Sequence, residues 1–132
     1  VEDALRTRRY SALTVVHSET STGTLTDIQA LATLAHQYDC AVLVDSVTGL
    51  GGVPVETDAW GLDFVLTGSQ KALALPPGLA FGVASERFIA DAGQADGRGL
   101  YFDLVEFEQY IHKNQTPNTP ALSLLYATAV QG

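Results

Sequence analysis

The chain is poor in cationic side chains and in cysteine. Its 132 residues hold 7 Lys and Arg against 15 Asp and Glu, for a net charge of −8. A face that binds nucleic acid needs a surplus of Lys and Arg, so the composition argues against a nucleic-acid partner. No apolar run approaches the ~20 residues that cross a bilayer, which argues against a membrane protein. The single cysteine, Cys40, has no partner for an internal disulfide, and this fits a reducing, cytoplasmic setting.

Methionine is absent altogether, and the N-terminus lacks the basic and then apolar order of a signal peptide. With 46% hydrophobic and 17% charged residues, the composition is typical of a soluble globular protein. The length suits one domain with a core of its own. We therefore interpret residues 1–132 as a single domain, cut or processed from a longer protein.

Four apolar runs predict buried strands, and amphipathic segments predict helices between and after them. A helix begins at Thr26, where Thr26 and Gln29 have the spacing of a capping box. Ser85 caps a helix through Ala92, Pro120 starts a last helix toward Gln131, and the segment 104–112 stays ambiguous. Apolar strands without alternation predict an α/β fold, a mostly parallel sheet with flanking helices on both faces. The predicted strands are 12–16, 41–44, 63–67 and 79–84.

Two of the predicted strands end close to charged side chains. Asp45 directly follows the run Ala41–Val44, and Lys71 follows Phe64–Thr67 after three residues. Ligands of a parallel sheet bind beyond the carboxyl ends of its strands, where both residues fall. A lysine amine can form a Schiff base with an aldehyde, and an aspartate can hold a proton on a ring nitrogen. Pyridoxal phosphate (PLP) requires both roles of its protein.

Other polar residues near this edge have simpler interpretations as well. The loop Ser18–Gly23 offers hydroxyls either to a cofactor or to a local turn. We interpret His17 as a hydrogen-bonded core residue rather than a general base. We interpret Cys40 as a core residue rather than a nucleophile. His36 and His112 lack metal-ligand spacing, so we expect no metal site. The glycines of 49–52 lack the order of a dinucleotide fingerprint and favour a tight backbone passage.

These residues resemble the class V aminotransferases of fold-type I, PLP-dependent enzymes, in the alanine–glyoxylate and serine–pyruvate branch. The resemblance covers roughly residues 10 to 85 and continues more loosely into 115–120. The motifs that carry it occur in the family's order and spacing. They are His17-Ser18-Glu19-Thr20-Ser21-Thr22-Gly23, Val44-Asp45-Ser46-Val47 with Gly51-Gly52, Gly68-Ser69-Gln70-Lys71-Ala72-Leu73, and Pro76-Pro77-Gly78.

The resemblance implies a role for each matching position. It implies that Lys71 forms the Schiff base with PLP and then carries the substrate proton, while Asp45 pairs with the pyridinium nitrogen. It implies that Thr20 binds the ring hydroxyl and that Gln70 contacts the cofactor. Either Thr116 or Thr119 would reach the phosphate of a neighbouring subunit, because the family builds its sites across a homodimer. The substrates implied are a small amino acid, alanine or serine, and a keto acid such as glyoxylate or pyruvate.

The same resemblance leaves alternatives open. A cysteine desulfurase-like or other class V lyase would keep the lysine chemistry, although Ser-Gln before Lys71 favours the aminotransferases and Cys40 is badly placed for desulfuration. Family groups that grip the phosphate, stack on the ring and bind the substrate carboxylate lie outside residues 1–132. We therefore expect a partial PLP-binding large domain that is inactive by itself. A truncated domain with no catalytic role is the remaining alternative.

Overall fold

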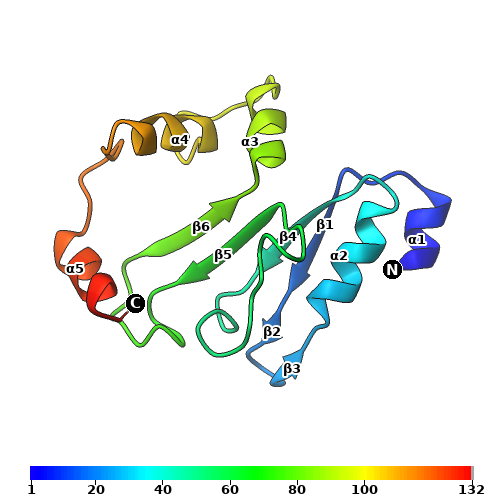
Figure 1. The fold of residues 1–132 in the computed structure, drawn as a ribbon, viewed down its shortest axis with the longest axis horizontal. Coiled ribbons are helices and arrows are strands. Elements are labelled where there is room, and N and C mark those ends of the chain that lie inside the picture. The colour runs from blue at the N-terminus through cyan, green and yellow to red at the C-terminus, as the bar shows by residue number, and fades with distance from the viewer. Residues whose placement is uncertain (132) are drawn as a thin grey trace.

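The computed structural model describes residues 1–131, which form a four-stranded sheet with helices around it (Figure 1). A two-stranded hairpin is separate from this sheet. The elements in chain order are α1 (Glu2–Thr7), β1 (Ala12–Val16), β2 (Ser18–Glu19), β3 (Thr24–Leu25), α2 (Ile28–His36), β4 (Ala41–Asp45), β5 (Phe64–Gly68), β6 (Ala80–Ala84), α3 (Glu86–Gly93), α4 (Leu104–His112) and α5 (Leu122–Gln131).

The sheet has the order β1-β4-β5-β6 and is mostly parallel. Strands β1 and β4 run parallel with Val16 opposite Asp45, and β4 and β5 run parallel with Asp45 opposite Leu66. Only β6 is antiparallel to its neighbour, β5. The sequence prediction of an α/β fold with a mostly parallel sheet and flanking helices is therefore confirmed. The carboxyl ends of β1, β4 and β5 meet at one edge of the sheet.

The core lies between one face of the sheet and helix α2. Val42, Val44 and Val65 point to this face and are 0–2% exposed. Helix α2 brings Ile28, Ala32 and Ala35 against them, at the spacing of one helix face. Cys40 is 0% exposed in the same cluster, which confirms its interpretation as a core residue.

The opposite face is less covered than the sequence predicts. Phe88 of α3 packs its ring 5.7 Å from that of Phe64, but Leu66 stays 37% and Val16 42% exposed. Strands β1 and β6 are the outermost strands of the sheet, and both carry more exposed than buried positions. The prediction of a buried strand at 12–16 was wrong, because an apolar run does not reveal whether a strand has one neighbour or two.

Local capping also differs in one place. Asp27, and not Thr26, caps helix α2, because the Asp27 carboxylate accepts the Ala30 N–H at 3.0 Å. Ser85 caps α3 as expected, accepting the Phe88 N–H at 3.1 Å. The ambiguous segment 104–112 is helix α4, and the last helix begins at Leu122, two residues after Pro120. None of the helices described in residues 1–131 has the length and apolar character that crossing a membrane requires.

Candidate functional site

Lys71 lies on the loop between β5 and β6. Hydrogen bonds within this loop hold it closed. Ser69, 0% exposed, donates its N–H to Leu79 O at 3.1 Å and its hydroxyl to Pro76 O at 2.7 Å. The Ser69 carbonyl accepts the Leu75 N–H at 3.0 Å. Ser69 is thus the buried anchor of the loop, and Lys71 is held exposed on the surface two residues further on.

Glycines allow close packing on both sides of this loop. A Cβ on Gly68 would lie 2.8 Å from Gln70 Oε1, so the missing side chain lets Gln70 fold back over the end of β5. Gly51, with φ +90°, and Gly52 pass within 3.5 Å of the Ala72 side chain when a Cβ is placed on them. An added Cβ would come closer than ordinary contact at Gly49, 2.7 Å from His17 Nδ1, and at Gly51, 3.2 Å from Leu73 Cδ2, so these two glycines serve a tight backbone passage.

Asp45 ends β4 at the same edge of the sheet. Its Oδ1 accepts the Val47 N–H at 3.0 Å, and its main-chain oxygen accepts the His17 N–H at 2.8 Å. The carboxylate is exposed. Within residues 1–131, neither the Asp45 carboxylate nor the Lys71 amine takes part in an ion pair. Both charges at this edge are left available to a ligand.

Thr20 lies in the hairpin turn between β2 and β3, which sequence analysis treats as a plain loop. The Thr20 hydroxyl is 2.7 Å from the Thr48 hydroxyl, in the turn that follows Asp45. This bond ties the hairpin to the end of β4. Thr48 is a residue that sequence reasoning missed, because nothing in the sequence pairs the tip of one loop with the middle of another.

His17 and Ser46 form a buried pair beneath this edge. The His17 imidazole is 3% exposed, and its Nδ1 lies 3.1 Å from the hydroxyl of Ser46, which is 0% exposed. Burial lowers the pKa of His17. The interpretation of His17 as a hydrogen-bonded core residue is confirmed. Its partner was missed, although each residue directly follows one of two neighbouring strands.

The two candidate phosphate ligands lie elsewhere, between α4 and α5. Thr116 donates its hydroxyl to Asn118 O at 2.8 Å, and Thr119 is exposed. In the described part of the chain, neither is hydrogen-bonded to Thr20, Asp45 or Lys71. The structure thus groups Thr20, Asp45, Gln70 and Lys71 at one sheet edge, whereas Thr116 and Thr119 make no hydrogen bond to these residues in the described part of the chain.

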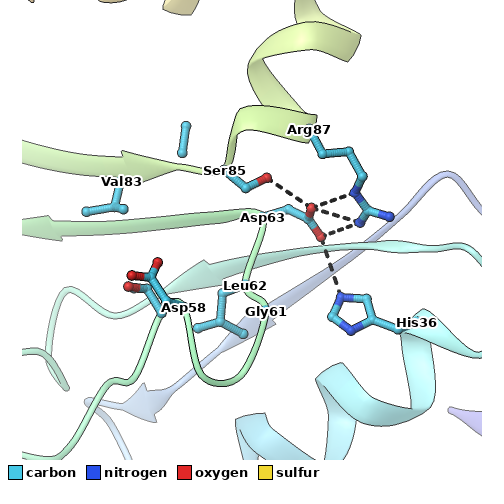
Figure 2. Close-up of a pocket in the computed structure, with 10 residues that line it drawn as sticks. His36, Asp58, Gly61, Leu62, Asp63, Val83, Ser85 and Arg87 are labelled. Carbon is cyan, nitrogen blue, oxygen red and sulfur yellow. Dashed lines mark hydrogen bonds and ion pairs between the residues drawn. The ribbon is translucent and has the colours of Figure 1, made fainter.

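The opposite edge of the sheet holds a second polar cluster, which we call the Asp63 cluster: Asp63, Ser85, Arg87 and His36 (Figure 2). Arg87 donates to both Asp63 oxygens at 2.7 and 2.8 Å, and the Ser85 hydroxyl lies 3.2 Å from Oδ1. His36 Nε2 is 3.7 Å from Oδ2. The Val42 N–H donates to the same carboxylate at 2.8 Å. These bonds fix the start of β5 to β4 and to the end of β6.

The Asp63 cluster borders a cavity of about 440 Å³. Burial favours the neutral acid, but hydrogen bonds from the Val42 N–H and from Arg87 outweigh it, so the pKa of Asp63 is lowered. Hydrogen bonding to Asp63 raises the pKa of Arg87. The cavity lies away from Lys71, and its charged groups already bind one another. We interpret it as a structural feature.

The residues at the Lys71 edge match the chemical groups of PLP. The Lys71 amine, which forms no ion pair within residues 1–131, can react with an aldehyde. The exposed Asp45 carboxylate can pair with a protonated ring nitrogen, and the Thr20 hydroxyl can bind the ring oxygen. A thiol-based reaction finds less support here, since burial and the charge of Asp63 raise the pKa of Cys40. Within residues 1–131, no group of three or more His, Cys, Asp and Glu is placed to hold a metal ion.

Comparison with known proteins gives a family match over almost the whole chain. The family model described as Aminotransferase class-V matches residues 1–129. The chain is similar to an uncharacterized aminotransferase of Methanocaldococcus jannaschii, 43% identical over 121 residues, covering 90% of this chain and 31% of the relative. It is also similar to serine–glyoxylate aminotransferase of Arabidopsis thaliana, 38% identical over 119 residues, covering 87% of this chain and 29% of the relative.

A solved structure agrees with these relatives. The alanine–glyoxylate aminotransferase of Nostoc sp. superimposes with a TM-score of 0.90 at 32% identity, covering 98% of this chain and 35% of the other. The chain therefore spans about a third of the length of the proteins that it matches.

Proposed function

The chain belongs to the class V aminotransferase family, and on that premise we propose that it supplies the lysine-bearing part of a PLP-dependent aminotransferase. The reaction moves an amino group from a small amino acid, alanine or serine, to a keto acid such as glyoxylate or pyruvate. One observation carries the proposal: Lys71 and Asp45 follow neighbouring parallel strands at the same sheet edge, and both charges are without an ion-pair partner in residues 1–131.

Three side chains would hold the cofactor. Lys71 Nζ would hold PLP at its aldehyde carbon, Asp45 would keep a proton on the ring nitrogen, and Thr20 would donate its hydroxyl to the ring oxygen. Bound PLP supplies an electron sink for the charge that develops at the substrate α-carbon. Lys71 Nζ would then accept the substrate α-proton as a general base. Gln70, folded over the end of β5, borders the cofactor beside Lys71.

The substrate class rests on the relatives. The names of two similar proteins give serine–glyoxylate and alanine–glyoxylate as their reactions. Both pairs combine a small amino acid with a small keto acid. The substrates of the whole protein stay a proposal, since about two thirds of each relative has no counterpart in this chain.

Between the two threonines, hydrogen bonding favours Thr119 as the phosphate ligand. A doubly charged phosphate accepts hydrogen bonds, so a threonine must offer it a free O–H. The Thr116 hydroxyl already donates to Asn118 O at 2.8 Å. Thr119 is exposed and has no such side-chain bond within residues 1–131. The phosphate that it reaches would belong to the second subunit of a homodimer.

Two alternatives make different predictions. A desulfurase needs a mobile thiolate, and Cys40 is 0% exposed with a raised pKa, so this chain offers none. An inert domain would bind no cofactor. We also expect that residues 1–132 by themselves bind PLP weakly and do not transaminate, because these residues offer no carboxylate-gripping arginine at the Lys71 edge.

Covalent trapping tests the proposal directly. The full-length protein is loaded with PLP, reduced with borohydride, digested and mapped by mass spectrometry. Lys71 and Lys113 are the chain's two lysines, so Lys113 is the internal control. We expect the phosphopyridoxyl mass on the Lys71 peptide and none on the Lys113 peptide. An unmodified Lys71 in protein that has bound PLP would overturn the proposal. Alanine, serine and cysteine as amino donors then separate transamination from desulfuration.

A further inference from the structure

We propose that His17 and Ser46 are positioning residues that fix Asp45 for the cofactor, with Gly49 leaving the space that their contact needs. The inference rests on the proposed function, because it takes Asp45 as the partner of the ring nitrogen. Neither residue would touch the cofactor. They act on the orientation of Asp45 through the peptide that follows it.

The backbone bonds of the pair hold the peptide that follows Asp45. The His17 N–H donates to Asp45 O at 2.8 Å, which fastens the peptide after Asp45 to the end of β1. The Ser46 N–H donates to Leu66 O at 2.9 Å, which fastens that same peptide to β5. The His17–Ser46 side-chain bond joins the two attachments. Asp45 thus leaves the sheet from a peptide that is held on both sides.

The direction of the side-chain bond follows from burial. Ser46 is 0% exposed, and its O–H needs an acceptor. Among the described residues, the hydrogen-bond partner of this hydroxyl is His17 Nδ1, at 3.1 Å. We therefore assign Ser46 as the donor and place the imidazole proton on Nε2. A neutral imidazole suits this arrangement, since a proton on Nδ1 would leave the serine hydroxyl without its acceptor.

Gly49 shows how little room the pair leaves. A Cβ at this position would lie 2.7 Å from His17 Nδ1 and 2.9 Å from Ser46 Oγ. The turn at 46–49 therefore closes directly over the bond, and the Gly49 N–H donates to Ser46 O at 3.1 Å. In the same turn, a Cβ on Gly52 would meet nothing nearer than 3.5 Å. Gly52 is thus a matched control for Gly49.

A double-mutant cycle on the full-length protein tests the inference by PLP affinity, measured by equilibrium titration. We expect Ser46→Ala to weaken PLP binding roughly fivefold, the effect of one lost hydrogen bond. On an Asp45→Asn background, the same Ser46→Ala change should alter binding by less than about twofold, because its target is gone. An equal loss on both backgrounds means a general structural role and overturns the inference.

Three further variants, one of them a control, keep the test decisive if Ser46→Ala folds poorly. His17→Asn retains an acceptor near the Nδ1 position and should bind PLP within about threefold of the wild type. Gly49→Ala forces the pair apart and should weaken binding roughly tenfold, while Gly52→Ala stays within about twofold. Equal behaviour of the two glycine variants would contradict the inference.

Borohydride trapping on each variant separates this inference from the proposed function. If Lys71 is labelled but the effects of Ser46→Ala and Asp45→Asn on PLP binding are additive, the positioning role alone is overturned. A failure to label Lys71 in the wild type would overturn both.

Discussion

The two ends of strand β5 use charged residues in opposite ways. At its start, Asp63 is 3% exposed, and its carboxylate accepts hydrogen bonds from Arg87, Ser85 and a main-chain N–H. Beyond its end, Lys71 is exposed and forms no ion pair within the described residues, as is also true of Asp45 beside it. Charge at the first edge stabilises the fold, whereas charge at the second is free to bind a ligand.

This difference teaches how to separate a functional cluster from a structural one. The Asp63 cluster has the shifted pKa values and borders a cavity of about 440 Å³, yet all of its interactions are internal. Perturbed titration in a cavity is a frequent sign of an active site, but ion-pair networks produce it as well. Unmet hydrogen-bonding and charge capacity is the better guide in this molecule.

The largest effect that we predict is on the Lys71 edge. Lys71→Ala in the full-length protein should lower the rate of amino transfer by roughly 10²–10⁴-fold, the contribution of a positioned general base. The free energy of unfolding of the cofactor-free protein should stay within about 0.5 kcal/mol of the wild type, because an exposed, unpaired lysine supports no other group. Steady-state kinetics and chemical denaturation measure the two quantities.

The control for this variant is Lys113→Ala, at the C-terminal cap of α4. It should keep both the rate and the stability. A loss of rate in Lys113→Ala equal to that in Lys71→Ala would remove the distinction between the two lysines.

The second prediction concerns the Asp63 cluster, where we expect a substitution to lower stability and leave PLP binding unchanged. Asp63→Asn leaves Arg87 without its carboxylate and weakens the bonds to Val42 N–H and Ser85. We expect it to lower the free energy of unfolding by about 2 kcal/mol, as for hydrogen bonds to one buried charge whose partner, Arg87, is 47% exposed. The folded fraction should keep its PLP affinity. Asp58→Asn borders the same cavity at an exposed position and should cost less than about 0.5 kcal/mol.

The sequence predicts the residues of the Lys71 edge but not those of the Asp63 cluster. Asp45 and Lys71 each follow an apolar run, so parallel strands alone bring them to one edge. The Asp63 cluster depends instead on β6 running antiparallel to β5, which places Ser85 and Arg87 beside Asp63. Strand direction depends on long-range pairing, and no local pattern in 79–84 reveals it. The cluster was missed for that reason.

The same limit explains the errors at the periphery. The hairpin β2–β3 consists of two-residue strands, too short for any alternation to be visible. Asp27 displaces Thr26 as the cap of α2 because both are good capping residues, and the true helix start decides between them. His17 and Ser46 were each recognisable as strand-end residues, but their contact follows only from the β1–β4 register.

The third prediction concerns acid. The pKa of Asp63 is lower in the folded protein than its ordinary value of 3.8, so the unfolded chain binds a proton more readily. The stability that this carboxylate contributes is therefore fully present above pH 3.8 and is lost as the pH falls through the folded pKa. The difference in unfolding free energy between the wild type and Asp63→Asn should shrink over that range. Denaturation titrations across acidic pH measure it, and a constant difference would contradict the linkage.

The smallest effect that we predict is a gain in stability next to the Lys71 edge. Thr67 is 3% exposed, and its hydroxyl has no hydrogen-bond partner among the described residues. It borders an apolar cavity of about 230 Å³, lined by Leu50, Leu73 and Phe81 among others. The other hydroxyl of this cavity, that of Thr128, already donates to Leu124 O, so the lining holds water poorly and the Thr67 hydroxyl is buried at a cost. Thr67→Val keeps the shape and should raise the free energy of unfolding by about 1 kcal/mol.

Thr128 supplies the control for this last comparison. It lines the same cavity, but its hydroxyl donates to Leu124 O at 2.8 Å, so Thr128→Val should give no gain. Chemical denaturation of both variants decides the matter. If Thr67→Val destabilises the protein, the hydroxyl has a partner in solution. The end of β5 near Lys71 would then be as fully hydrogen-bonded as its start at Asp63, and the contrast between the two edges would rest on Lys71 and Asp45 alone.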